Sequence, residues 1–247
     1  MKILISGYLG HMGQEVAKLA SAGYMGASLY AGVDINAEGN EPIPCAMSFD
    51  KAVTDADCIV DFSHHSNTKA LLDFAVANKL PLVLATTGQT DEEKQMIAEA
   101  AKSIPLFFAA NYSLGIAILI DLAKKTAAAM PDAEIEIIEK HHDRKVDAPS
   151  GTALAIADAI HEVRTDSVNH LGRAGFGKRE KNEIGIHAIR MGNIVGEHEV
   201  IIGTQNQTIT LKHEAHSRAL FAEGALSAAA FIVKQSAGLY NMKDLIK

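Results

Sequence analysis

The first 110 residues alternate short apolar runs with helical stretches, and no other feature restricts the fold as strongly. The runs have the length of strands, whereas the stretches between them repeat apolar residues at helical spacing. Apolar strands separated by helices are typical of a parallel sheet covered on both faces. We therefore expect an α/β fold here. Strands are expected at Lys2–Ser6, Ser28–Asp34, Cys58–Phe62, Leu82–Ala85 and Leu106–Ala109, and helices at His11–Ala22, around Ala70–Ala75 and at Glu92–Ala101.

The loop after the first strand reads Gly7-Tyr8-Leu9-Gly10-His11-Met12-Gly13 and opens the first helix. Glycines let the backbone turn sharply and approach a ligand, and the helix N-terminus attracts phosphate. The spacing is G-x-x-G-x-x-G and not G-x-G-x-x-G, so the loop alone is a weak signal. Asp34 strengthens it, because an acid at the end of the second strand can bind an adenosine ribose. The alternative is a turn plus an ordinary strand-end acid. Strand, loop, helix and acid together predict a Rossmann-like dinucleotide site.

The residues after Asp34 indicate which dinucleotide fits. Ile35, Asn36, Ala37 and Glu38 include no basic side chain. A 2′-phosphate would therefore lack a cation nearby, and the Asp34 carboxylate would repel it. The sequence predicts NADH as the preferred cofactor and NADPH as the alternative.

Two further loops follow strand ends where such sheets bind ligands. Ala85-Thr86-Thr87-Gly88 and Ala109-Ala110-Asn111-Tyr112-Ser113 offer room for a flat ring and polar groups for a carboxamide. The alternatives are a plain turn and a helix cap by Ser113. His64 and His65 either line the same cleft or lie on the surface. The predicted cofactor-binding residues are Gly7, Tyr8, Leu9, Gly10, His11, Met12, Asp34, Ala85, Thr86, Thr87, Ala109, Ala110, Asn111 and Tyr112.

From Ser113 onward the pattern predicts a second, α+β domain with an open mixed or antiparallel sheet. A helix is expected at Ser113–Ala129 and a half-exposed strand at Ala133–Glu139. Between Glu183 and His213, β-branched runs separated by turns predict an antiparallel meander. Residues 165–182 are polar and glycine-rich and are expected to form a long loop. A last helix is expected at Leu220–Val233.

Composition excludes several classes of protein. The net charge of −7 leaves no basic stripe for a nucleic-acid backbone, so no nucleic-acid partner is expected. No apolar run approaches the ~18 residues of a membrane span. The opening strand is too short for a signal peptide, and we expect a cytoplasmic protein. Cys45 and Cys58 match no zinc or redox spacing and are expected to be buried thiols.

The segment from Glu139 to Ala153 carries the densest chemistry. It contains His141, His142, Arg144 and Lys145 within five residues of a net-acidic chain. Ser150 is then a plausible N-cap of a helix whose first amides, those of Gly151 and Thr152, suit a carboxylate. Imidazoles and an ammonium beside such a cradle suit proton transfer to an anionic substrate. One alternative is a solvated basic turn with a capped helix. The other is a metal site, which we do not expect because adjacent histidines diverge on a strand.

Taken together, these residues resemble the 4-hydroxy-tetrahydrodipicolinate reductase family, also called dihydrodipicolinate reductase. The resemblance covers essentially the whole chain and is most specific in residues 139–153, which match the pattern E-x-H-H-x-x-K-x-D-x-P-S-G-T-A. It extends to the glycine loop, to Asp61-Phe62-Ser63, to the loops at residues 85–88 and 109–113, and to Ile194-Val195-Gly196-Glu197-His198.

The resemblance implies reduction of 4-hydroxy-tetrahydrodipicolinate in lysine and diaminopimelate biosynthesis, with loss of water and hydride delivery from the nicotinamide to ring carbon C4. It implies a dinucleotide-binding domain of residues 1–112 and 217–247. Residues 113–216 would form a substrate-binding domain that also carries the contacts of a homotetramer. By position, His141 is implied as proton donor and acceptor, Lys145 as proton donor, and His142, Gly151 and Thr152 as substrate-binding residues, with no metal.

Two departures from the family pattern bear on the cofactor. Many members carry arginine where this chain has His11, and several carry a basic residue where it has Ile35. Both changes weaken phosphate contacts, in agreement with a preference for NADH. Two other functions stay open at this point: a reductase of another small dicarboxylate or imine, and a dinucleotide-sensing module without turnover.

Overall fold

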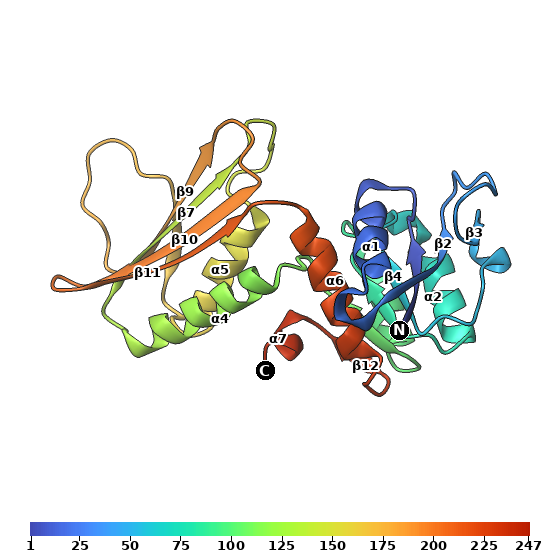
Figure 1. Cartoon of the computed structure of the whole chain (residues 1–247). Coiled ribbons are helices and arrows are strands. Elements are labelled where there is room, and N and C mark those ends of the chain that lie inside the picture. The colour runs from blue at the N-terminus through green and yellow to red at the C-terminus, as the bar shows by residue number, and fades with distance from the viewer. The chain divides into compact units, whose positions relative to one another are not determined.

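The computed structural model describes all residues from Met1 to Lys247, which form two compact units (Figure 1). Unit 1 consists of Met1–Ser113 together with Ala219–Lys247, and unit 2 consists of Leu114–Arg218. What each unit binds stays a prediction. No helix is both long enough and apolar enough to cross a membrane.

Unit 1 is built on a seven-stranded sheet in which every pair of neighbours is parallel. The prediction of a parallel α/β sheet is confirmed. Its order is β12-β6-β5-β4-β1-β2-β3. The sequence did not reveal the edge strands β3 and β12, because two or three residues are too few for a periodic signal. The strands are β1 (Lys2–Ser6), β2 (Ser28–Val33), β3 (Cys45–Ala46), β4 (Cys58–Asp61), β5 (Leu82–Leu84), β6 (Pro105–Phe108) and β12 (Gly238–Tyr240).

Helices cover both faces of this sheet. On one face, α2 and α3 bury Leu71, Leu72 and Ile97 against the strands. On the other face, α1 packs against α6, which also contacts β4, β5 and β6. A Cβ on Gly224 of α6 would lie 1.7 Å from the Tyr112 carbonyl oxygen, so the helix approaches that closely only because this residue is glycine. The helices are α1 (His11–Ser21), α2 (Thr68–Ala77), α3 (Asp91–Ala100), α6 (Ala219–Ile232) and α7 (Met242–Leu245), with 3-10 turns at Tyr24–Gly26, Phe49–Lys51 and His65–Asn67.

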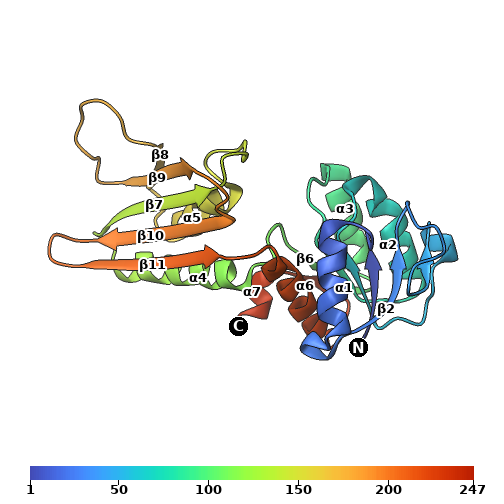
Figure 2. The same ribbon diagram turned by 45° about the horizontal axis from the view of Figure 1, so that its top comes forward.

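Unit 2 contains a mixed five-stranded sheet of order β11-β10-β7-β9-β8. Helices α4 and α5 cover one face, and no helix covers the other (Figure 2). The mixed sheet confirms the predicted fold class. The elements are α4 (Leu114–Ala129), β7 (Glu134–His141), α5 (Gly151–His161), β8 (Val168–Leu171), β9 (Glu183–Arg190), β10 (Gly196–Gly203) and β11 (Thr208–Ala215).

The predicted antiparallel meander is wrong for β9. Only β10 and β11 form an antiparallel hairpin, whereas β9 pairs in parallel with β7. The crossover through α5 returns the chain in the direction of β7, so β7 lies between β9 and β10. Turn residues alone could not reveal this order, because β7 is distant in sequence.

The predicted loop at residues 165–182 also needs correction. Val168–Leu171 forms the edge strand β8, which pairs in parallel with β9. Asn169 and His170 in its middle are polar, as an edge strand tolerates, and this polarity hid the strand from the sequence pattern.

Candidate active site

The glycine loop of unit 1 follows β1 and leads directly into α1. Gly10 is the N-cap of α1, and Gly7 has φ +79°, which favours glycine. A Cβ on Gly7 would lie 2.6 Å from the Phe62 carbonyl oxygen, and one on Gly13 would lie 2.1 Å from the Gly7 carbonyl oxygen. The loop is therefore closely packed against the residue after β4. Since the chain order reverses between β1 and β4, this is the point where such sheets bind ligands.

Asp34, directly after β2, holds this loop in place. Its Oδ2 accepts a hydrogen bond of 2.9 Å from the Leu9 amide, and its Oδ1 accepts one of 3.0 Å from the Asn36 amide. Each oxygen keeps acceptor capacity for a further donor, since a carboxylate oxygen has two lone pairs. The residue can thus stabilise the loop and bind a ligand hydroxyl together.

A cavity of about 460 Å³ opens beside the loop. Its lining includes Gly7, Gly10, Asp34, Ile35 and His64 and contains no lysine or arginine. A glycine loop at a helix N-terminus, a carboxylate and an apolar wall fit the adenosine half of a dinucleotide. His64 lines this cavity, which is the first of the two positions that the sequence analysis allowed for it.

The side chains of three predicted cofactor residues lie in the core. Tyr8 is buried, Thr86 donates a hydrogen bond of 2.6 Å to Asp61, and the Tyr112 hydroxyl donates one of 2.9 Å to the Leu84 carbonyl oxygen. These three residues can therefore contact a cofactor only through their main-chain groups. Others are exposed or half-buried on the loops, namely Leu9, Gly10, His11, Met12, Thr87, Ala109, Ala110 and Asn111, whereas Ala85 is buried.

Asp61 is a functional candidate that sequence reasoning gave only as part of a motif. Its fully buried carboxylate accepts hydrogen bonds from Ser63 Oγ at 2.6 Å and from Thr86 Oγ1 at 2.6 Å. Burial raises the pKa of Asp61, although these hydrogen bonds act in the opposite direction. The residue joins the end of β4 to the loop after β5.

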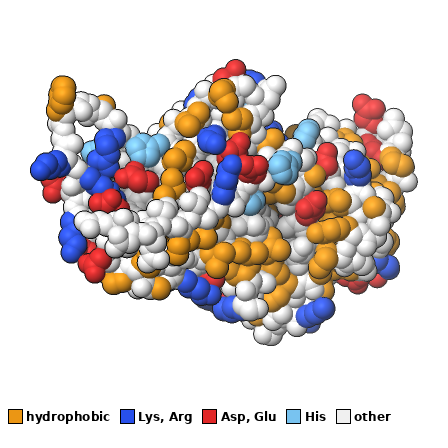
Figure 3. Space-filling model, turned by 60° about the vertical axis from the view of Figure 1, so that its left-hand side comes forward, with side chains coloured by type: hydrophobic (Ala, Val, Ile, Leu, Met, Phe, Trp, Pro, Cys, Tyr) orange, Lys and Arg blue, Asp and Glu red, His pale blue; other side chains and the backbone are white.

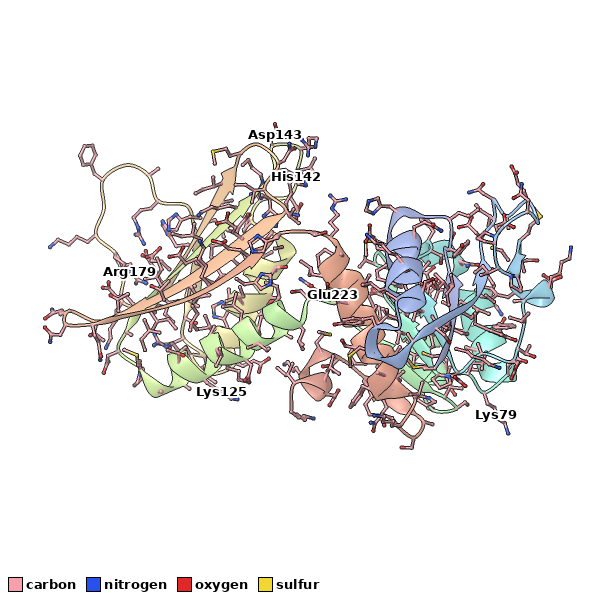
Figure 4. The ribbon with its side chains drawn as sticks, in the orientation of Figure 1. Lys79, Lys125, His142, Asp143, Arg179 and Glu223 are labelled. Atoms are coloured by element: carbon pink, nitrogen blue, oxygen red, sulfur yellow. The ribbon has the colours of Figure 1, made fainter.

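In unit 2, a second cluster forms at the end of β7. Alternate residues of this strand are buried, so Glu139 and His141 point to the same, helix-covered face. Strand pairing sets Arg190 of β9 opposite His141 and His198 of β10 opposite Glu139. Figure 4 labels His142 and Asp143 at this end of the sheet and Arg179 at the other.

Glu139 is 0% exposed and fully hydrogen-bonded. It accepts from Arg190 through both guanidinium nitrogens at 2.8 and 2.7 Å, from His141 Nδ1 at 2.6 Å and from the Ser150 amide at 3.0 Å. Burial alone would raise the pKa of Glu139, but Arg190, His141 and the Ser150 amide together hold it below its usual value. The carboxylate is therefore ionised inside the unit.

His141 is 9% exposed, and its ring lies edge-on to that of His198 with 5.2 Å between centroids. A Cβ on Gly196 would lie 3.1 Å from His141 Nε2, so the glycine keeps space beside that nitrogen. With Nδ1 bound to Glu139, Nε2 is the nitrogen available for proton exchange.

His198 lies in surroundings that disfavour its charged form. Burial, together with the nearby positive charge of His141, lowers the pKa of His198 to about 4. At neutral pH this histidine is uncharged, and it lies 3.0 Å from Ser150 Oγ through Nε2. It can support the helix cap but cannot donate a proton as an imidazolium.

The depressed pKa of His198 predicts how stability depends on pH. Between pH 6.5 and about 4 the unfolded chain binds a proton at this residue and the folded protein does not. The free energy of unfolding should therefore fall as pH decreases through this window, by up to roughly 3 kcal/mol from this group. Urea unfolding at pH 7 and pH 4.5 should show a smaller fall in His198→Gln, which keeps a polar group beside Ser150. Equal falls in both proteins would contradict the assignment.

The amino end of α5 lies beside these histidines. Ser150 is its N-cap and accepts a hydrogen bond of 3.2 Å from the Ala153 amide. Gly151 and Thr152 are the first residues of the helix, and nothing lies within 4 Å of a Cβ built on Gly151. The backbone is thus open to a ligand at the positive end of the helix.

His142 and Lys145 complete the predicted set. The Lys145 amide donates to the His142 carbonyl oxygen in a turn, and Lys145 Nζ lies 2.8 Å from Asp147. His142 Nδ1 is buried without a hydrogen-bond partner. Burial and the nearby Arg144 lower the pKa of His142. The structure brings His141, His142, Lys145, Gly151 and Thr152 into one unit around the end of β7 and the start of α5.

Sequence reasoning missed Arg190 as a site residue and left Glu139 and His198 without a role. Glu139 and His141 are two residues apart on a predicted strand, a spacing that signals a shared face. Only the strand order places Arg190 at this cluster, so no local pattern could have identified it.

On the face drawn in Figure 3, lysine and arginine side chains lie among acidic ones and form no continuous basic patch.

Comparisons with known proteins agree along the whole chain. The family described as "Dihydrodipicolinate reductase, N-terminus" matches residues 1–112, and "Dihydrodipicolinate reductase, C-terminus" matches residues 115–246. The 4-hydroxy-tetrahydrodipicolinate reductase of Caldanaerobacter subterraneus subsp. tengcongensis is 45% identical over 249 residues, covering 100% of this chain and 98% of the relative. That of Clostridium novyi is 43% identical, covering 100% and 98%. The dipicolinate-bound dihydrodipicolinate reductase of Paenisporosarcina sp. TG-14 has a TM-score of 0.82 at 26% identity, covering 98% of this chain and 97% of the other.

Proposed function

The chain belongs to the dihydrodipicolinate reductase family, and from this premise we propose that it reduces 4-hydroxy-tetrahydrodipicolinate to tetrahydrodipicolinate with NADH or NADPH. One hydride and one proton enter, and one water leaves. The reaction belongs to lysine and diaminopimelate biosynthesis. The observation that carries the proposal is the cluster in unit 2, where His141 is bound by a buried carboxylate beside the amino end of α5.

The proposed substrate is a ring with two carboxylates, and unit 2 has groups suited to it. The amides of Gly151 and Thr152 at the positive end of α5 would hold one carboxylate. His142, with its unpaired Nδ1, would donate a further hydrogen bond. The dipicolinate bound to the Paenisporosarcina relative is likewise a ring dicarboxylate, which supports this class of ligand.

His141 and Lys145 would move the protons. His141 Nε2 would donate to and accept from the reacting ring, because Nδ1 is committed to Glu139. Lys145, which is paired with Asp147, would supply a second donor on a flexible side chain. A reduced nicotinamide, when bound, supplies the hydride to ring carbon C4. In unit 1 the glycine loop, Asp34 and the cavity beside them would hold that cofactor.

A direct assay tests this function. The protein, NADH and freshly generated 4-hydroxy-tetrahydrodipicolinate should together lower the absorbance of the reduced cofactor. If the absorbance falls neither with NADH nor with NADPH, the proposal is contradicted. A panel of other small dicarboxylates and imines tests substrate identity, and we expect turnover of the cyclic substrate to exceed that of each alternative.

We further propose that NADH is preferred. The cavity offers no cation to a 2′-phosphate, and Ile35, 78% exposed, lines it next to Asp34. Replacing Ile35 by arginine should raise kcat/KM for NADPH by roughly 10–100-fold, since one charge-assisted hydrogen bond contributes about 1.5–3 kcal/mol. The matched control is Ile35→Gln, which adds length without charge. A wild-type kcat/KM for NADPH equal to that for NADH would contradict the preference.

For the assembly we propose a homotetramer formed through unit 2. Its sheet has one face without helices, on which β7 carries the half-exposed Glu136, Ile138 and Lys140. Such a face can pair with a second copy of itself. The pairing would leave the helix-covered cluster on the opposite face untouched.

A further inference from the structure

We propose that Glu139, gripped by Arg190, is the positioning residue that fixes His141 in the tautomer and orientation needed for proton transfer. The inference rests on the proposed function, which gives His141 the role of proton donor and acceptor. Glu139 is the first residue of the segment 139–153, and Arg190 lies outside that segment. Neither Glu139 nor Arg190 contacts the substrate in this account.

A hydrogen bond joins the side chains of Glu139 and His141. The side chains project from the same face of β7, and Oε2 lies 2.6 Å from Nδ1. A buried, ionised carboxylate can only accept, so Nδ1 carries the hydrogen. Proton exchange is thereby confined to Nε2, beside which Gly196 leaves space. A free imidazole would populate both tautomers and several ring orientations.

Glu139 is ionised although it is 0% exposed. A buried carboxylate without a cation would take up a proton. Arg190 prevents this with two hydrogen bonds, one to each carboxylate oxygen. This bidentate geometry also fixes the plane of the carboxylate, and with it the direction of the His141 ring.

The hydrogen bonds of Arg190 and Glu139 also reach the other candidate groups. Arg190 Nη2 also donates to the Asp147 carbonyl oxygen at 2.6 Å, two residues beyond Lys145. Glu139 Oε1 also accepts from the Ser150 amide, at the start of α5. One buried ion pair thus connects the imidazole, the lysine segment and the carboxylate cradle. The titratable and charged groups around His141 are Glu139, Arg190, His198, His142 and Lys145.

The test begins with Glu139→Gln, which keeps the shape and removes the charge. We expect kcat to fall by about 10–100-fold, with KM for substrate and cofactor changed by less than about 3-fold.

A double-mutant cycle separates positioning from a structural role. If Glu139 acts only through His141, adding Glu139→Gln to His141→Ala should lower single-turnover activity by less than about 2-fold further. If Glu139 has only a structural role, Glu139→Gln should lower single-turnover activity by the same factor in the wild type and in His141→Ala. Arg190→Lys provides a second variant that keeps the positive charge but not the bidentate geometry, and the same cycle applies to it. Circular dichroism and thermal unfolding identify any variant that fails to fold, and the other then carries the test.

Glu136→Gln is the matched control. Glu136 lies on the same strand and its Oε2 binds His187 Nε2 at 2.7 Å, with Arg173 Nη2 at 3.2 Å from Oε1. It reproduces the Glu–His–Arg chemistry on the opposite face of β7, which is also the face of the proposed assembly. Its replacement should leave kcat unchanged when the variant has the oligomeric state of the wild type. Absence of turnover in the wild-type protein would overturn the proposed function itself, and full activity of His141→Ala would overturn the role given to His141. Two outcomes would overturn only the role of Glu139, provided that His141→Ala is inactive. In the first, Glu139→Gln keeps the wild-type kcat. In the second, Glu139→Gln lowers activity by the same factor with and without His141.

Discussion

Replacement of His141 by alanine is expected to lower kcat by about 10²–10⁴-fold, which is the usual contribution of a positioned acid or base. The variant loses the only imidazole in the cluster whose Nδ1 is held by a buried carboxylate. His198 cannot substitute for it, because its pKa of about 4 leaves it uncharged at neutral pH. Steady-state rates at saturating substrate and cofactor would measure the fall.

Cofactor affinity decides whether the His141 result is specific. Titration of His141→Ala with NADH should give the wild-type dissociation constant, because the proposed cofactor groups lie in unit 1. His187→Ala is a suitable control, since it removes a histidine that also binds a glutamate of β7, on the opposite face. It should keep wild-type kcat. A His141→Ala protein that binds NADH much more weakly would mean that the site is assigned wrongly.

Replacement of Lys145 by alanine should lower kcat by a similar factor of about 10²–10⁴. Its ammonium is the cation that we propose as the second proton donor, and its side chain is only 22% exposed. The hydrogen bond from Lys145 holds the pKa of Asp147 below its usual value, so this carboxylate is ionised beside the ammonium. Steady-state rates at saturating substrate and cofactor would measure the fall.

The control for Lys145 is Lys140→Ala. Lys140 is five residues earlier and is paired with Glu197 at 2.9 Å, but it projects from the opposite face of β7. Removing a charge there tests whether any nearby cation would have the same effect. We expect kcat to be unchanged in Lys140→Ala. Equal losses in the two variants would point to general electrostatics and against a role for Lys145 as donor.

The elements that the sequence revealed are those whose signals are local. The strands around Ile3–Ile5 and Val60 are short and apolar on both faces, which occurs in covered parallel sheets. Gly13 is required by a contact with Gly7 six residues earlier, so the spacing of these glycines identified the loop, whereas the close approach of Gly7 to Phe62 became visible only in the fold. Residues 139–153 likewise combine a strand end, a turn and a capped helix in one continuous stretch.

Elements whose existence depends on partners were mispredicted. β8 has two polar residues in its middle and is a strand only because β9 pairs with it. The order of the second sheet was also wrong, because the position of β7 between β9 and β10 follows from a parallel crossover and not from any turn. Local propensity contains no information about which strands become neighbours.

By itself, the sequence determined the fold class, and it predicted the dinucleotide loop with Asp34 and the five residues of unit 2 that we assign to substrate and proton transfer. Only the tertiary structure decided how His141 is held. Arg190 is 51 residues from Glu139, and His198 is 48 residues from Ser150, so no local pattern connects them. The pairing of β7 with β9 and β10 joins them on one buried face, where the loss of water makes a carboxylate depend on its hydrogen-bond donors.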